Sequence, residues 1–103
     1  MDSHDICELA SGLASRANNL SVDTTGADSR TLMEQQDQLS NLALAAIAKD
    51  LDATTKEFAA TYDILIQATA AADAAAKQIQ QVANAITMIG KAITSVASLL
   101  RTA

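Results

Sequence analysis

The sequence predicts an all-α fold, and three observations support this prediction. Half of the 103 residues are hydrophobic but only 2% are aromatic, so the apolar residues are mainly Ala, Leu, Ile and Val. The chain has no proline and only three glycines, so the usual helix breakers are scarce. Apolar residues recur at steps of three and four, the spacing of one helical face. We therefore expect a single helical domain over residues 1–103, without strands.

The first predicted element is a short amphipathic helix over residues 4–20. Ser3 is the expected N-cap, and Asp5 lies in the first turn, where a carboxylate meets the positive end of the helix dipole. The apolar face of this helix consists of Ile6, Leu9, Leu13, Ala17 and Leu20. Residues 21–28 are rich in turn-forming residues and have no apolar period, so we expect them to form a loop.

A long helical region is predicted over residues 29–102, with Asp28 or Ser29 as its cap. Three alternatives are open for a break: near 50–55, where Thr54 and Glu57 have the spacing of a capping box; near 69–73, where the apolar spacing changes; or no break at all. The region is therefore a long helical hairpin or one very long helix. Its first apolar stripe consists of Leu32, Leu39, Ala43, Ile47, Leu51, Thr54, Phe58, Tyr62, Leu65 and Thr69.

The C-terminal part of this region predicts a heptad seam that packs against other helices. Its apolar residues alternate steps of three and four without interruption, as in coiled coils. The predicted interaction seam consists of Ala72, Ala75, Ile79, Val82, Ile86, Ile89, Ile93, Val96 and Leu100.

Two further stripes accompany the seam. One has only small residues at a spacing of seven, which would let a neighbouring helix approach closely. This close-packing stripe consists of Ala76, Ala83, Gly90 and Ala97. The other is almost uncharged, which predicts contact with protein, membrane or a lumen, and it consists of Gln80, Gln81, Asn84, Thr87, Lys91, Thr94, Ser95 and Ser98.

Enzymatic chemistry is not expected from this sequence. The chain has one His and one Cys, and it lacks the motifs of phosphate-binding loops, zinc hydrolases and serine hydrolases. His4 and Cys7 are three residues apart, but two ligands do not close a metal site. We therefore predict no catalytic residue, no cofactor and no bound metal.

The charge is unevenly distributed along the chain. Residues 1–73 hold all twelve acidic side chains and four of the seven basic ones, whereas the remainder holds only Lys77, Lys91 and Arg101. A nucleic-acid-binding protein would show a clustered basic face, so no nucleic-acid partner is expected. This asymmetry favours staggered contacts between the acidic body of one copy and the basic tail of the next.

The N-terminus lacks the basic start and apolar core of a secretory signal, and Cys7 has no second cysteine for an intrachain disulfide. This predicts a cytoplasmic protein, or one exported without a cleaved signal peptide.

Together these features favour a structural or interaction protein that self-assembles through its C-terminal seam into a closed bundle, ring or filament. Its expected partner is a second copy or another helical protein. One alternative is a membrane-active protein, such as a pore or channel subunit, that contacts the bilayer through residues 77–101. Another is an acidic binding module that neutralises a basic toxin, as immunity proteins do, or chaperones a secreted partner.

Overall fold

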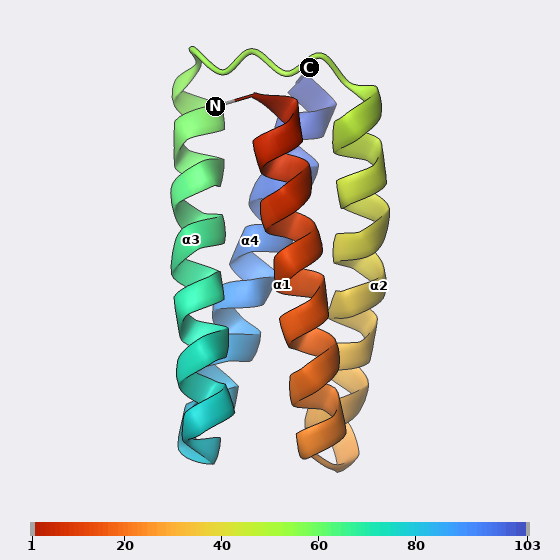
Figure 1. Ribbon diagram of the computed structural model, residues 1–103, viewed down its shortest axis with the longest axis vertical. Helices are drawn as coiled ribbons and strands as arrows, with labels where there is room; N and C mark the ends of the chain where they lie inside the picture. Colours follow the sequence, from red (N-terminus) through yellow and green to blue (C-terminus); the bar gives the residue numbers. More distant parts are fainter. Residues whose placement is uncertain (1, 103) are drawn as a thin grey trace.

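The computed structural model describes residues 2–102 and contains four α-helices and no strand within that range. The helices are α1 (Ser3–Asp23), α2 (Gly26–Ala48), α3 (Lys56–Lys77) and α4 (Val82–Thr102), and a single 3₁₀ turn, η1 (Ile79–Gln81), precedes α4 (Figure 1). The all-α prediction is therefore confirmed. The expected short helix corresponds to α1. The predicted helical region over 29–102 contains three helices, α2, α3 and α4, and its C-terminal part forms the α3–α4 hairpin.

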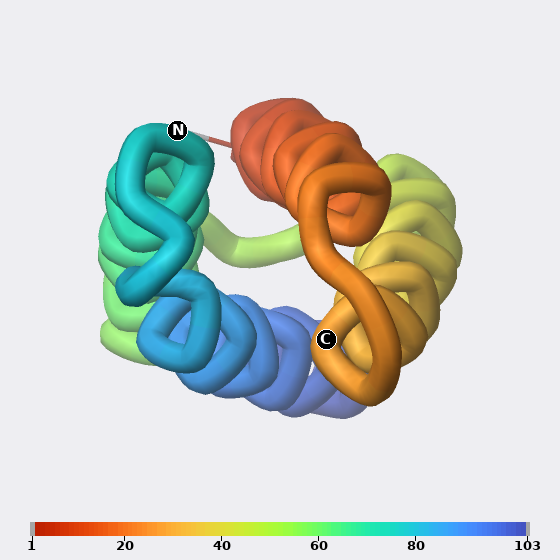
Figure 2. The backbone as a smooth tube through the Cα atoms, turned by 90° about the horizontal axis from the view of Figure 1, so that it is seen from below, coloured from red at the N-terminus to blue at the C-terminus, as the bar shows by residue number. Residues whose placement is uncertain are grey.

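The four helices form a bundle with one helix at each corner (Figure 2). α1 contacts α2 and α3, and α4 contacts the same two helices, so α1 and α4 lie at opposite corners. The segment between α2 and α3 crosses the end of the bundle from one corner to the opposite one (Figure 1). The radius of gyration is 13.0 Å, the size of a compact chain of this length. One chain therefore encloses a core without a partner.

Each helix contributes one apolar face to this core at heptad-like spacing. Large side chains alternate with alanines along these faces, which lets the helices pack closely. The buried residues of α3 are Phe58, Thr61, Leu65, Ala68, Ala72 and Ala75, and those of α4 are Val82, Ala85, Ile89, Ala92, Val96, Leu99 and Leu100.

The α1–α2 turn is much shorter than the predicted loop over 21–28, and that prediction was wrong. Only Thr24 and Thr25 separate the two helices, and Gly26 adopts a φ of +66°, a conformation that favours glycine. The Thr24 hydroxyl donates to the Leu20 carbonyl, and the Ser29 hydroxyl donates to the Ser21 carbonyl. These hydroxyls satisfy carbonyls in the last turn of α1. The residues that predicted a loop therefore lie in the helix ends and the short turn between them.

The N-cap of the first helix lies one residue before the predicted cap. Asp2 is the N-cap, and its side chain and that of Asp5 form a reciprocal capping box. Ser3, the predicted N-cap, instead bridges to the loop that follows α2. Its hydroxyl donates to the Lys49 carbonyl and accepts from the Leu51 N–H, both at 2.9 Å. This pair of bonds ties the α2–α3 connection to α1.

Of the three open alternatives for the first break, the structure has the one near 50–55. α2 ends at Ala48 and α3 begins at Lys56, whereas residues 69–73 lie inside a continuous α3 and no single long helix forms. The N-cap of α3 is Thr55, whose hydroxyl accepts from the Phe58 N–H, so the cap lies one residue after Thr54. Asp52 accepts from the Thr54 hydroxyl and N–H, and these bonds lower the pKa of its carboxyl.

The second break, at Gln78, was not predicted. The Gln78 backbone is extended, and its N–H donates to the Ala74 carbonyl as the last bond of α3. Neither glycine nor proline marks this turn. The predicted uninterrupted seam over residues 72–100 is therefore divided between two antiparallel helices, α3 and α4.

Polar contacts join the helices at a few points. The Thr61 and Ser95 hydroxyls are 2.8 Å apart between α3 and α4. Arg16 Nε donates to Asp73 Oδ1 at 2.8 Å between α1 and α3. Gln35 is 6% exposed, and its Nε2 donates to the Ile86 carbonyl at 2.9 Å between α2 and α4. These bonds favour the observed register of the helices over slipped ones.

Candidate interaction site

The predicted seam residues do not all lie in the core. Val82, Ile89, Val96 and Leu100 are buried in α4, and Ala72 and Ala75 are buried in α3. Ile79 lies in η1 and is 61% exposed. Ile86 and Ile93 are half-buried at the edge of the core, whereas Ala85, Ala92 and Leu99 are buried in their place. Relative to the predicted seam, the buried face of α4 is therefore shifted towards Ala85 and Ala92, because α2 and α3 both pack on this helix.

The predicted small-residue stripe and the uncharged face mostly lie on the surface. Ala76 and Ala83 are exposed, and Gly90 and Ala97 are half-buried. Gln80, Asn84, Thr87, Lys91, Thr94 and Ser98 are exposed, while Gln81 and Ser95 are half-buried. We call the outward side of α4, formed by Ala83, Thr87, Gly90, Lys91, Thr94 and Ser98, the α4 outer face.

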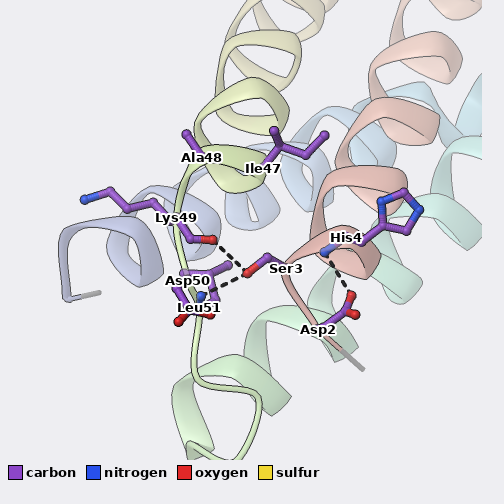
Figure 3. A pocket seen from close by; sticks show the side chains of 8 residues that line it. All are labelled: Asp2, Ser3, His4, Ile47, Ala48, Lys49, Asp50 and Leu51. Carbon is purple, nitrogen blue, oxygen red and sulfur yellow. Dashed lines mark hydrogen bonds between the residues drawn. The ribbon is translucent and has the colours of Figure 1, made fainter.

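The pocket at the N-terminal end of the bundle has polar walls but no catalytic arrangement (Figure 3). It has a volume of about 470 Å³ and is lined by Asp2, Ser3, His4 and residues 47–51. The Ser3 hydroxyl points towards Lys49 and Leu51, and the His4 ring points away from it. The His4 imidazole instead lies 3.1 Å from Glu8. Ser3 therefore contacts the α2–α3 connection and His4 contacts Glu8 of its own helix, and the two side chains do not contact each other.

A second pocket runs between the exposed sides of α1 and α2, and we call it the α1–α2 groove. Its volume is about 490 Å³. The buried alanines Ala14 and Ala43 lie at its base. The other lining residues are Cys7, Ser11, Ser15 and Asn18 from α1, and Gln36, Ser40 and Leu44 from α2. Small side chains on α1 thus leave room for an occupant.

Large apolar side chains extend along this groove. Six large hydrophobic residues are exposed among those the structure describes, and four of them, Val22, Met33, Leu44 and Ile47, belong to α1 or α2. On α1, residues 7, 11, 15 and 18 line the groove. Val22 follows the last of them by four residues, so it lies on the same side of the helix. On α2, residues 36, 40 and 44 line the groove. Met33 lies three residues before the first of them and Ile47 three residues after the last, so both share that side of α2. These exposed apolar residues therefore lie on the sides of α1 and α2 that form the groove, beyond the residues that line it.

Carboxylates lie on both helices beside the groove. Asp37 is four residues after Met33 and seven before Leu44, so it shares their side of α2. Glu8 is seven residues before Ser15 and is exposed on α1. Cys7 is a half-buried free thiol in the lining. Among residues 2–102, no group of three His, Cys, Asp or Glu side chains is arranged to hold a metal ion.

The sequence patterns did not predict this groove because none of the predicted stripes followed the sides of α1 and α2 that line it. Ile47 belonged to the predicted stripe but is 60% exposed, and Ala46 is buried instead. Met33 and Leu44 lay outside every predicted stripe. Large apolar residues outside the core period were the available signal for a surface contact.

The C-terminal segment Ile79–Thr102 is long and apolar enough to cross a membrane, by length and composition alone. In the bundle, the large apolar side chains of α4 face the core or its edge. Insertion of this segment into a bilayer would therefore require the bundle to open.

Comparisons with family models, with curated proteins and with solved structures found no significant match.

Proposed function

We propose that this protein is a helical interaction protein that self-associates, and that its contact surface is the α1–α2 groove. The observation that carries the proposal is a groove of about 490 Å³ lined by the exposed Leu44, together with Val22, Met33 and Ile47, which are exposed on the same sides of α1 and α2. Exposed apolar residues scattered singly are ordinary, but several along one concavity are typical of an interface.

The contact predicted from sequence used the C-terminal seam. In the folded chain, Val82, Ile89 and Val96 are buried by the other helices. A partner on the seam would have to displace these intrachain contacts, whereas a partner in the groove would cover side chains that now face water. Because covering apolar surface stabilises an interface, we assign the proposed contact to the groove.

Leu44→Asp is expected to weaken self-association strongly without unfolding the chain. Leu44 is 69% exposed, so the folded monomer loses little when the side chain changes. In the interface, a buried leucine contributes about 1.5–3 kcal/mol. Its replacement by a charge should therefore raise the dissociation constant at least about tenfold. Sedimentation velocity across a concentration series measures this change.

Ile66→Asp is the matched control, because Ile66 is a 45% exposed apolar residue on α3, outside the groove. It is expected to leave the dissociation constant unchanged. A wild-type chain that stays monomeric at tens of micromolar would disprove self-association. Equal weakening by both variants would show that the association is not specific to the groove.

One observation favours a second candidate, a membrane-active protein. The segment Ile79–Thr102 has the length and composition of a membrane span, and α4 carries Lys91 and Arg101 but no acidic residue. Anionic lipid would attract these bases. Co-sedimentation with anionic vesicles at low salt tests this candidate, and the absence of binding would exclude it.

A further inference from the structure

We infer that the occupant of the α1–α2 groove is the α4 outer face of a second copy of this chain. The inference rests on the proposed self-association and adds the identity of the two surfaces that meet. Three features of the bundle support it: the shape of the α4 outer face, its charge, and its place opposite α1.

The α4 outer face offers a surface into which apolar side chains can pack. It contains a shallow hollow of about 560 Å³, lined by Thr87, Gly90, Lys91, Thr94, Ser95 and Ser98. Gly90 lies in the interior of α4, where glycine destabilises a helix relative to alanine. Outside its own helix, a Cβ at Gly90 would meet Gln35 Nε2 at 3.7 Å, an ordinary van der Waals contact, so packing within the chain does not require glycine.

The hydroxyl groups on this face have partners within their own helix. Thr87 donates to the Ala83 carbonyl and Thr94 donates to the Gly90 carbonyl, both at 3.1 Å. A second molecule can therefore cover these threonines without leaving their donors unpaired. Exposed apolar side chains beside the groove, such as Met33 and Leu44, would pack into this hollow of the second copy.

Charge distinguishes this pairing from the two symmetric ones, groove against groove and α4 outer face against α4 outer face. The hairpin formed by α1 and α2, with its N-cap, carries seven carboxylates and two arginines, whereas α4 carries Lys91, Arg101 and no acid. Two grooves facing each other would bring together two surfaces that both carry Asp37 and Glu8. Lys91, in the lining of the hollow, would instead approach these carboxylates. The opposite charges favour contact between groove and α4 outer face.

The geometry makes this contact heterologous. α1 and α4 lie at opposite corners of the bundle, so one chain presents the groove and the α4 outer face to different neighbours (Figure 2). Each copy then uses its groove to bind one neighbour and its α4 outer face to bind another. Such contacts propagate into an open chain or close into a ring, and they do not stop at a two-fold dimer.

Cross-linking tests the pairing, with Cys7 as a natural probe in the groove. Thr94→Cys introduces a second thiol on the α4 outer face, and a bismaleimide with a spacer too short to cross the bundle joins neighbouring thiols. We expect Cys7 to be linked to position 94 of another copy, with products beyond the dimer on a denaturing gel and the linked peptides identified by mass spectrometry. Gln67→Cys, at an exposed position of α3, is the off-face control and is expected to give no such products.

The alternatives give different products. Cross-linked dimers of the unaltered chain, through Cys7 alone, would show groove-to-groove contact and overturn the inference. Cross-linked dimers of the Cys7→Ser, Thr94→Cys double variant would show contact between two α4 faces and also overturn it. Association without any of these links would contradict the pairing but not the proposed self-association, whereas a monomer at all concentrations would contradict both.

Charge reversal gives an independent readout. Lys91→Glu is expected to raise the dissociation constant by about threefold to tenfold at low salt, with less effect as salt increases. Lys56→Glu, at the first residue of α3, makes the same change of charge away from both surfaces and is expected to have no effect. Unchanged association of the Lys91 variant would contradict the inference.

Discussion

Replacing Ile89 by Asp is expected to unfold the isolated chain. Ile89 is fully buried in the middle of the inner face of α4. The substitution removes the packing of a large apolar side chain, which costs about 2–5 kcal/mol, and adds a carboxyl group with no partner in the core. Domains of this size are stable by only about 5–15 kcal/mol. Circular dichroism at neutral pH should show the loss of most helical signal.

Asn84→Asp is the matched control for this prediction. It places the same carboxylate at an exposed position near the start of α4, where the helix dipole favours negative charge. The control variant should keep its helical signal. A folded, monomeric Ile89→Asp chain would instead mean that the seam faces other molecules, as expected from sequence, and would contradict the bundle.

Phe58→Ala is expected to lower the free energy of unfolding by about 3–5 kcal/mol. Phe58 is the only phenylalanine, is fully buried, and lies in the first turn of α3 below the Thr55 cap. A domain of this length loses about 4–8 °C of melting temperature per kcal/mol, so the midpoint should fall by roughly 12 °C or more. Thermal unfolding followed by circular dichroism, together with urea titration, measures the change.

Ile66→Ala provides the comparison for Phe58→Ala. Ile66 belongs to the same helix but is 45% exposed, so its truncation should cost no more than about 1 kcal/mol. Equal losses from the two variants would contradict the assignment of Phe58 to the core and Ile66 to the surface.

Local chemistry was sufficient to predict the helical class and the position of the first helix, and it offered a break near 50–55 as one of three alternatives. The spacing of Ile6, Leu13 and Leu20 defines one face of α1, and all three are buried. A capping pattern close to Thr55 marked the start of α3, because a hydroxyl that accepts from a backbone N–H acts within a few residues. These features depend on interactions between near neighbours in the chain.

The turn at Gln78, the rotation of α4 and the α1–α2 groove depended on contacts between distant segments. Gln78 has no local turn signal, and the chain reverses there so that α3 and α4 can pack against each other. Alanine is compatible with both core and surface, so the apolar period alone did not distinguish Ala85 and Ala92 from Ile86 and Ile93. That choice was made by α2 and α3, which flank α4. The same packing decides that Leu44 and Ile47 remain exposed, because the face of a helix that turns inward is set by its neighbours.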